Sequence, residues 1–500
     1  MGGWRRNGRK ALHINQGSLS GGGTWAEVRA FIVARKPRNG GGAKGGRKVD
    51  IIMNIQREEK SAVVADKPKQ AEEIQPDEKR AWVEPSVWTE RMLAALKNGV
   101  KGGKWFSLMD KVYNDKNLAA AWRKVKDNQG AAGIDRQSVE MFEAEKGKYL
   151  AEIQSSLRES RYQAAPVKRV WIPKPGSNEK RPLGIPTVKD RVVQTALRNV
   201  IEPIFENIFA GHSYGFRPGL GCKDALRQVE ALLRAGYTWV VDADIRKYFD
   251  TIPHDRLMQD IKTLIADGRV LRLIEDYLKQ DVMDGLETWE VENGTPQGAV
   301  VSPLLANIYL NQIDHEMAKL GFEMIRYADD FVILCKSEDE ARLALSKIQT
   351  MIKDRGLTLH PEKTRIVNVY HPGGFEFLGY HFERDTRWPR KKSLDKLKDN
   401  IRCKTKRNSG SSLKAIIEDL NQTLIGWVGY FKHSRKQTFP PLDGWIRMRL
   451  RSILRKRQGG KGRGRGADHQ KWPNAFFGKL GLFSLSAAHA AAYQSRCGNH

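Results

Sequence analysis

The chain has 500 residues, enough for about two to four domains, and 40% of them are hydrophobic, so a sizeable core is expected. Its net charge of +28 favours a polyanionic partner, with nucleic acid as the leading candidate. No apolar run is long enough to span a membrane, and four separated cysteines without a CxxC pair favour a reducing compartment and argue against a zinc knuckle.

The N-terminal segment, residues 1–85, is rich in glycine, arginine and lysine and then in mixed charge. Such a composition buries too little apolar surface to offset the cost of ordering the chain, so this basic extension is predicted to be disordered. The first residues carry basic side chains but no apolar segment, and a secretory signal is therefore not expected.

The next region alternates between helical and strand-like patterns. Apolar residues at helical spacing predict helices over residues 118–125 and 139–157. A strand is predicted over residues 167–173, followed by a loop from Lys174 to Pro182. Helical spacing then resumes from Asp190 to Phe209.

The centre of the chain follows a βαββαβ order, which predicts a ferredoxin-like unit. Ser337 followed by Glu340 forms a capping box that supports the start of the second helix. An insertion between the two halves carries a further strand over residues 288–292. The six predicted elements are strand 237–244, helix 255–265, strand 322–327, strand 331–335, helix 338–353 and strand 364–369.

Three aspartates mark the ends of these strands. Asp244 ends an apolar strand, and Asp329 and Asp330 lie on the tight turn of the later hairpin. On the predicted fold they meet at one edge of the sheet. Clustered carboxylates bind hard divalent cations, and a pair of Mg²⁺ ions supports in-line attack on phosphorus, so the pattern indicates nucleotide polymerisation. The alternative is an ordinary solvated turn, for which aspartate is a favoured residue.

Polymerisation also needs cations for the triphosphate and a wall that checks the sugar. Lys174 and Arg181 bracket a glycine-containing turn that suits phosphate binding, although basic residues on exposed loops are usually solvated. Phe249 lies five residues after the first aspartate, where an aromatic ring either excludes a 2′-hydroxyl or fills a core. Gln297 supplies an amide beside a glycine, and Lys363 lies in a turn within reach of a primer phosphate.

The region after residue 388 is basic and helical. Apolar residues between Ile416 and Phe431 fall on one helical face, and a second helix over residues 445–454 carries arginines between its apolar positions. A basic, glycine-rich stretch over residues 455–465 follows, and residues 472–477 open a short apolar tail that should pack on the rest.

From about Trp105 to the C-terminus the chain resembles the group II intron-encoded reverse transcriptases with maturase activity. The downstream motifs Gly426–Phe431 and Leu442–Arg447 resemble the maturase, or thumb, region and separate this family from retroviral polymerases. The upstream motifs that carry the resemblance are Asn128–Asp135, Ile172–Pro186, Ser213–Gly219, Gly294–Gly298, Tyr327–Asp330 and Phe377–Tyr380.

The resemblance implies an α+β, right-hand polymerase with helical fingers, a ferredoxin-like palm and an α-helical thumb. It places an N-terminal extension and the fingers in residues 86–240 and the palm in residues 241–387. The thumb, or maturase domain, is expected in residues 388–465, and its C-terminal tail in residues 466–500.

The resemblance also implies the roles of individual residues. Asp244, Asp329 and Asp330 would form the catalytic site for two Mg²⁺ ions. Lys174, Arg181, Phe249 and Gln297 would bind the nucleotide. The remaining predicted contacts are Arg217, Tyr327 and Lys363 for primer and template, and Arg447, Arg449 and Arg451 for RNA on the thumb.

The implied function is RNA-directed DNA synthesis by a protein that also binds its intron RNA to assist splicing and retrohoming. Its partners would be dNTPs, an RNA template, a DNA primer, structured intron RNA and target DNA, in the bacterial cytoplasm or an organelle. Three departures are visible. Ala299 stands where many relatives have a second glycine, the long extension before Trp105 has no family counterpart, and no cysteine-paired His-Asn-His nuclease follows the thumb. Second-strand cleavage would then come from elsewhere, or mobility would use replication-fork primers.

Two alternatives differ in purpose. A splicing cofactor that binds RNA without polymerising predicts loss of the metal-site acids, and all three acids are present. Reverse transcriptases of phage defence, CRISPR spacer acquisition or DNA repair share the polymerase chemistry. The thumb motifs count against the first two of these, whereas a domesticated repair role stays open.

Overall fold

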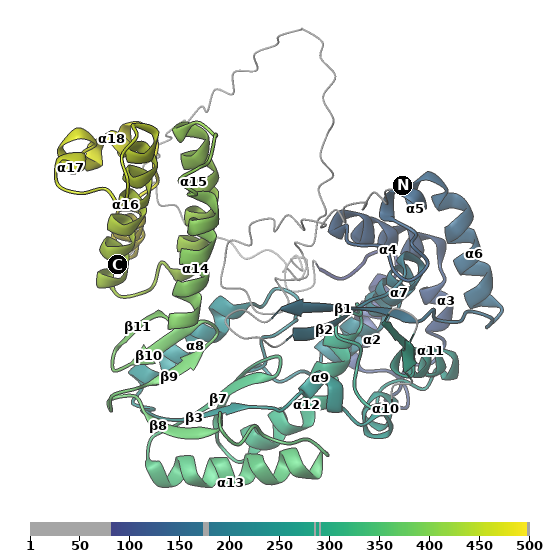
Figure 1. The fold of residues 1–500 in the computed structure, drawn as a ribbon. Helices are drawn as coiled ribbons and strands as arrows, with labels where there is room; N and C mark the ends of the chain where they lie inside the picture. The colour runs from purple at the N-terminus through teal and green to yellow at the C-terminus, as the bar shows by residue number, and fades with distance from the viewer. Residues whose placement is uncertain (1–81, 174–179, 285–286, 290–291, 498–500) are drawn as a thin grey trace, which may run out of the picture.

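The computed structural model describes residues 82–173, 180–284, 287–289 and 292–497. Residues 1–81 of the predicted disordered segment, and the predicted phosphate contact of Lys174, lie outside these described residues. The end of that segment is ordered, because residues 82–85 are described and Val83 is buried. The fold belongs to the α+β class, with helices gathered around separate antiparallel and mixed sheets (Figure 1). None of the helices in the described part is long and apolar enough to cross a bilayer.

The N-terminal helices pack around one long helix that is buried along most of its length, α7. The helix predicted over residues 139–157 is interrupted, because Glu145 has a non-helical backbone and separates two shorter helices. The break places the Phe142 ring on that of Trp122, with centroids 4.3 Å apart. The helices of this region are α2 (Glu90–Asn98), α3 (Met109–Val112), α4 (Asp115–Asn128), α5 (Val139–Ala144), α6 (Lys146–Arg158) and α7 (Val188–Glu206).

A four-stranded mixed sheet follows the N-terminal helices. Strands β1 (Val167–Pro173) and β2 (Lys180–Ile185) are antiparallel, and β1 also pairs in parallel with β4 (Val282–Asp284), which pairs with β5 (Glu287–Trp289). The predicted strand over residues 167–173 is confirmed. The predicted loop is wrong at its end, because residues 180–182 already pair with β1 as part of β2.

The central sheet has four antiparallel strands in the spatial order β6-β7-β3-β8. The predicted βαββαβ order is confirmed, and each strand end lies within two residues of its predicted position. A short helix that was not predicted, α9 (Tyr248–Thr251), lies within the first half, between its strand and its helix. The strands are β3 (Trp239–Asp244), β6 (Glu323–Tyr327), β7 (Asp330–Cys335) and β8 (Arg365–Asn368).

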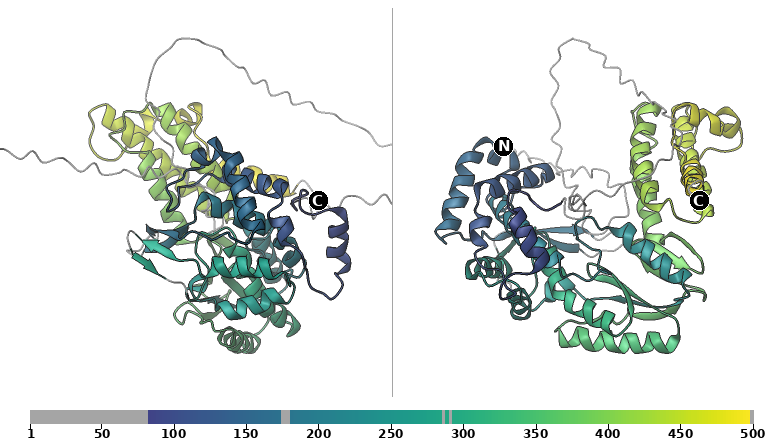
Figure 2. Two further views of the ribbon diagram at one scale, coloured as in Figure 1. Left: turned by 90° about the vertical axis from the view of Figure 1, so that its right-hand side faces the viewer. Right: turned by 180° about the vertical axis from the view of Figure 1, so that it is seen from behind.

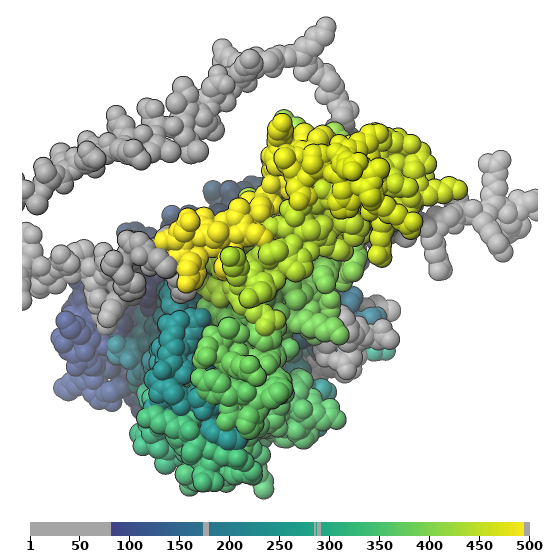
Figure 3. Space-filling view, turned by 90° about the vertical axis from the view of Figure 1, so that its left-hand side faces the viewer, coloured from purple at the N-terminus to yellow at the C-terminus, as the bar shows by residue number. Residues whose placement is uncertain are grey.

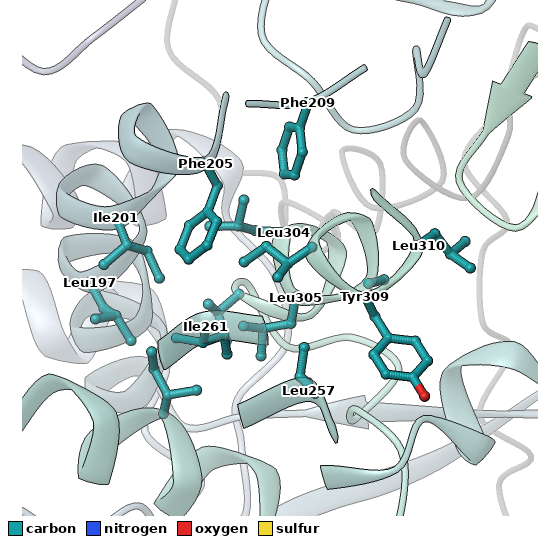
Figure 4. Close-up of a cluster of buried hydrophobic side chains, with 14 of the residues drawn as sticks. Leu197, Ile201, Phe205, Phe209, Leu257, Ile261, Leu304, Leu305, Tyr309 and Leu310 are labelled. Atoms are coloured by element: carbon teal, nitrogen blue, oxygen red, sulfur yellow. The ribbon is translucent and has the colours of Figure 1, made fainter. Parts of the chain in front are cut away.

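Helices α12 (Ser302–Lys319) and α13 (Glu338–Asp354) contact one face of this sheet. The helix predicted as the first crossover, α10 (His254–Lys262), instead packs on α12 and on α11 (Gly268–Leu278). Because α12 is apolar on nearly every side, it can be covered by the sheet and by other helices at once. Figure 4 shows the junction, where α10, α12 and α7 bring together the side chains of Leu257, Ile261, Leu304, Leu305, Leu197 and Ile201.

The opposite face of the central sheet is covered by α8 (Cys222–Arg234). The C-terminal helices share a core with this face through a small meander of β9 (Phe375–Phe377), β10 (Tyr380–Glu383) and β11 (Thr386–Pro389). The helices that follow are α14 (Lys391–Lys404), α15 (Leu413–Phe431), α16 (Phe439–Arg457), α17 (Ala467–Lys471), α18 (Asn474–Lys479) and α19 (Leu485–Cys497).

The molecule has two groups of helices, which lie toward opposite ends of the central sheet. Figures 1 and 2 show α4–α7 on one side and α14–α18 on the other, with α13 at the base below the sheet. In Figure 3 the C-terminal helices form one mass above the sheet region. The sheet face that carries α8 is therefore the face from which the C-terminal helices rise.

Candidate active site

Asp244 and Asp330 are directly opposite each other on the neighbouring strands β3 and β7. Directly opposed residues of antiparallel strands have Cα atoms about 4.5–5.5 Å apart and side chains on the same face. Alternation from Val240, which packs in the core shared with α8, puts Asp242 and Asp244 on that same face. The carboxylates therefore lie on the side of the sheet that α12 and α13 leave uncovered.

Asp329 joins this pair from the turn between β6 and β7. The pairing of Tyr327 with Asp330 leaves Ala328 and Asp329 as a two-residue connection, and Ala328 has φ +61°, as the favoured hairpin turns require. Burial raises the pKa of Asp329 to about 6, and the Asp244 carboxylate contributes to the rise. The structure thus brings the three predicted acids together, while their catalytic roles stay a prediction.

The acids repel one another electrostatically. Burial raises the pKa of Asp330 to about 8, with further contributions from the carboxylates of Asp329, Asp242 and Asp244. Asp242 was not among the predicted site residues, although its position two residues before Asp244 on a strand was a usable signal. A divalent cation would relieve this repulsion.

The donor set suits Mg²⁺, which binds through one or two carboxylates and keeps waters and substrate oxygens as its other ligands. The described residues contain no ready-made cluster of three metal-binding side chains. Lys363 Nζ lies 2.5 Å from Asp244 Oδ2 and forms an ion pair with that carboxylate. The Lys363 side chain is 58% exposed, so it can leave Asp244 when a cation binds. The predicted primer contact of Lys363 is untested, but its ammonium group lies at the acidic cluster.

We expect Asp330→Asn to stabilise the metal-free protein as pH rises. A carboxyl with a pKa near 8 in the folded chain and near 4 in the unfolded chain costs stability increasingly between about pH 4 and pH 8. Asparagine removes that cost. The melting temperature in EDTA should exceed that of the unmodified protein by about 1–3 °C at pH 8.5, with little difference near pH 5. Added Mg²⁺ should reduce the gap, and a gap independent of pH would contradict the assignment.

A buried charge network holds the turn. Arg326 on β6 is 1% exposed and donates hydrogen bonds to both oxygens of Asp314 on α12, at 2.5–3.1 Å. The same guanidinium donates to Asn307 Oδ1 and to the Ala328 carbonyl, both at 2.9 Å. Sequence reasoning missed Arg326, although a cation inside a buried strand was a signal that a buried partner exists.

The Ser213–Gly219 motif packs against the same turn. The Tyr214 N–H donates to the Arg326 carbonyl at 2.9 Å, and Asn307 Nδ2 donates to the Gly215 carbonyl at 2.7 Å. A Cβ on Gly215 would lie 2.2 Å from the Ala328 nitrogen, so only glycine fits this approach. The motif therefore positions the acidic turn.

Two residues predicted to contact primer or template, Arg217 and Tyr327, instead pack among the residues that hold the acidic turn. The Arg217 side chain is 8% exposed, and its guanidinium donates to Glu206 at 2.7 Å and to the Ala210 and Ser213 carbonyls at 2.6 Å. Tyr327 is 6% exposed, with its ring 6.4 Å from that of Phe216. These contacts indicate a positioning role for both residues.

The predicted nucleotide-binding residues lie around the acids. Arg181 on β2 is close enough to Asp329 for its positive charge to lower the pKa of that carboxyl against the larger effect of burial. Phe249 on α9 is half-buried beside Tyr248, with ring centroids 5.4 Å apart. Gln297 Nε2 donates to Asp250 Oδ1 at 2.9 Å.

Comparison with known proteins decides the family. The family model described as reverse transcriptase (RNA-dependent DNA polymerase) matches residues 172–382, and the group II intron, maturase-specific domain matches residues 394–472. Protein YkfC of Escherichia coli (strain K12) is 34% identical over 309 residues, which are 53% of this chain and 80% of YkfC. The chain belongs to the group II intron reverse transcriptase and maturase family.

Other relatives of this reverse transcriptase and maturase are longer proteins. The group II intron-encoded protein LtrA of Lactococcus lactis is 37% identical over 208 residues, which are 41% of this chain and 34% of LtrA. The chain thus spans about a third of the length of LtrA. A solved chain of a partial Cas6-RT-Cas1–Cas2 complex is 28% identical and covers 49% of this chain and 42% of its own, with a TM-score of 0.33, too low to define a shared architecture.

The three predicted RNA-binding arginines of the maturase region have different environments. Arg451 is 2% exposed and donates to the Trp472 carbonyl at 2.9 Å and to Asn474 Oδ1 at 2.8 Å, so its guanidinium is used inside the protein. Arg447 and Arg449 are half-buried on the same helix, α16. The roles of Arg447 and Arg449 in RNA binding stay a prediction. The buried placement of Arg451 does not favour an RNA-binding role for that residue.

Proposed function

We propose that this reverse transcriptase and maturase synthesises DNA on an RNA template with a two-magnesium site made of Asp244, Asp329 and Asp330. The observation that carries the proposal is the cross-strand pairing of Asp244 with Asp330 beside the turn residue Asp329. In this proposal residues 86–240 contain the fingers and residues 241–387 the palm of a right hand. The thumb occupies residues 388–465, with residues 466–500 as its tail.

Each side chain has a defined task in this mechanism. The three carboxylates lose their protons and supply anionic oxygens, and bound Mg²⁺ would activate the 3′-hydroxyl and offset charge on the leaving pyrophosphate. Arg181 on β2 would hold the triphosphate through its planar guanidinium, together with the ammonium group of Lys174 that the sequence predicts for the same task. Lys363 would move from Asp244 to a phosphate of the primer.

Phe249 and Gln297 would select the nucleotide. We expect Phe249→Val to raise ribonucleotide incorporation relative to deoxyribonucleotide incorporation by about 10- to 100-fold, because removing ring volume opens space for a 2′-hydroxyl. The measurement is the ratio of kcat/KM for rNTP and dNTP in primer extension. DNA synthesis by the same variant is the internal control, and an unchanged ratio would place Phe249 in the core only.

The maturase region would bind intron RNA for splicing and retrohoming into target DNA. The net charge of +28 and the match to the maturase-specific domain support this part of the proposal. LtrA is named as a group II intron-encoded protein, and YkfC and LtrA come from bacteria, which supports action in a bacterial cytoplasm. A relative from Arabidopsis thaliana is named as mitochondrial, so an organelle is the other setting.

The decisive experiment is primer extension by the purified full chain on RNA and DNA templates with Mg²⁺, run beside splicing of the RNA that flanks its reading frame. DNA synthesis on RNA together with faster splicing is the expected result. Splicing without DNA synthesis would overturn the polymerase proposal, and DNA synthesis without any effect on splicing would indicate a domesticated enzyme.

A further inference from the structure

A basic pocket lies in the maturase region between the end of α14, the middle of α16 and the loop after α16. Its volume is about 200 Å³. Four of its lining residues are arginines, Arg402, Arg407, Arg449 and Arg463, and Trp445 forms part of the wall. Among the described residues, those that line the pocket include no aspartate or glutamate. Four cations around one cavity without an acid favour binding of an anion.

Part of this pocket is rigidly built. Arg449 Nε donates to Thr405 Oγ1 at 2.6 Å, and its Nη2 donates to the Thr405 carbonyl at 3.0 Å. The guanidinium groups of Arg449 and Arg402 lie 5.6 and 5.7 Å from the centre of the Trp445 ring. A guanidinium fixed in this way loses little conformational freedom when it binds a phosphate.

The positive charges of the pocket are incompletely balanced. Burial lowers the pKa of Arg449, and the nearby charges of Arg402 and Arg407 lower it further, so the cations act on one another. Arg402 forms an ion pair with Asp399, which is not part of the lining. Arg407 and Arg463 are exposed. Neither forms an ion pair with any residue that the structure describes.

The surroundings of the pocket distinguish a polymer from a small anion. Exposed basic residues continue along the chain on both sides of its rim, at Lys406, Lys456, Arg457, Lys461 and Arg465. A single phosphate would meet only the pocket, whereas a strand with one phosphate per nucleotide can meet the rim as well. The lining residues also all fall within residues 394–472, the span of the maturase-specific match.

We propose that this pocket binds a backbone phosphate of an RNA strand, with Arg407 and Arg463 closing on it from the rim. This inference rests on the proposed maturase function and names a specific contact for it. Arginine suits the task because its planar fork donates two parallel hydrogen bonds to a phosphate.

The test compares two double variants that each remove two positive charges from the same region. Arg407→Gln/Arg463→Gln changes the pocket, and Lys414→Gln/Lys479→Gln changes exposed lysines that do not line it. Binding of a 20-nucleotide oligouridylate is measured across salt concentrations. Because each lost phosphate contact on a single strand lowers the slope of log K against log[salt] by about 0.7, the pocket variant should lose about 0.7 in slope.

The control variant should lose less than half as much, with both proteins melting at the temperature of the unmodified chain. Equal losses in the two variants, or none in the pocket variant, would overturn the proposal. A free-anion site is distinguished by inorganic phosphate at constant ionic strength. If phosphate raises the melting temperature only of proteins with the intact pocket, and the RNA slopes do not change, the pocket serves a small anion. Primer extension by the unmodified protein, measured in parallel, tests the polymerase proposal separately.

Discussion

Asp329→Asn is expected to reduce DNA synthesis on an RNA template by about a thousand-fold or more. Asparagine keeps the size of the side chain but removes an anionic oxygen from the position where Asp244 and Asp330 converge. Metal ions contribute several kcal/mol of transition-state stabilisation, and each 1.36 kcal/mol is about tenfold in rate. The measurement is primer extension at saturating Mg²⁺ and dNTP. The loss should appear mainly in kcat.

RNA affinity separates this effect from misfolding. The turn lies far from the maturase region in sequence, and the substitution does not change the charge on the surface of the maturase region. Binding of RNA should therefore fall less than about twofold. Asp127→Asn, an exposed aspartate at the end of α4, is the matched control and should retain full extension. Primer extension by Asp329→Asn close to that of the control would refute the metal-site assignment.

The central sheet could be predicted because its signals are local. Short, largely apolar runs bounded by turns or acids placed β3, β6 and β7 to within two residues, and a capping serine, Ser337, marked the start of α13. The convergence of Asp244 with the hairpin turn followed from the βαββαβ order alone. That order fixes which strands are neighbours before any side chain is placed.

The helices were harder, because competing segments had the same pattern. Both α10 and α12 show helical spacing between β3 and β6, and only packing decides that α12 contacts the sheet. The single helix predicted over residues 139–157 ignored a break at Glu145 that places Phe142 against Trp122. Periodicity cannot detect such breaks when polar residues of both helices remain on the solvent side.

The surroundings of the basic residues could not be predicted from the sequence. Arg217 and Arg451 were predicted to contact nucleic acid, and in the structure both guanidinium groups bind carbonyls or side chains within the fold. Conversely, Arg402, Arg407 and Arg463 form a pocket with Arg449 although they lie on three separate segments. The partners of an arginine depend on tertiary contacts, which a single sequence does not supply.

Arg326→Gln or Asp314→Asn alone is expected to destabilise the protein by about 3–5 kcal/mol, because each leaves an uncompensated charge in a buried site. Chemical denaturation of the full chain, followed by tryptophan fluorescence, measures the effect. The exposed pair Glu275–Lys279 provides the control, and Lys279→Gln should cost less than about 1 kcal/mol. If Arg326→Gln or Asp314→Asn lowered the free energy of unfolding by as little as Lys279→Gln does, the explanation by a buried uncompensated charge would be contradicted.

The double variant Arg326→Met/Asp314→Leu separates stability from positioning. Apolar residues of similar volume can replace a buried ion pair with little loss of stability, so much of the folding free energy should return. Activity should not return with it, because methionine cannot donate to the Ala328 carbonyl or to Asn307 Oδ1. We expect kcat for primer extension to stay at least about tenfold below that of the unmodified protein. A stable and fully active double variant would show that the backbone pairing of β6 with β7 positions the Asp329–Asp330 turn without this network.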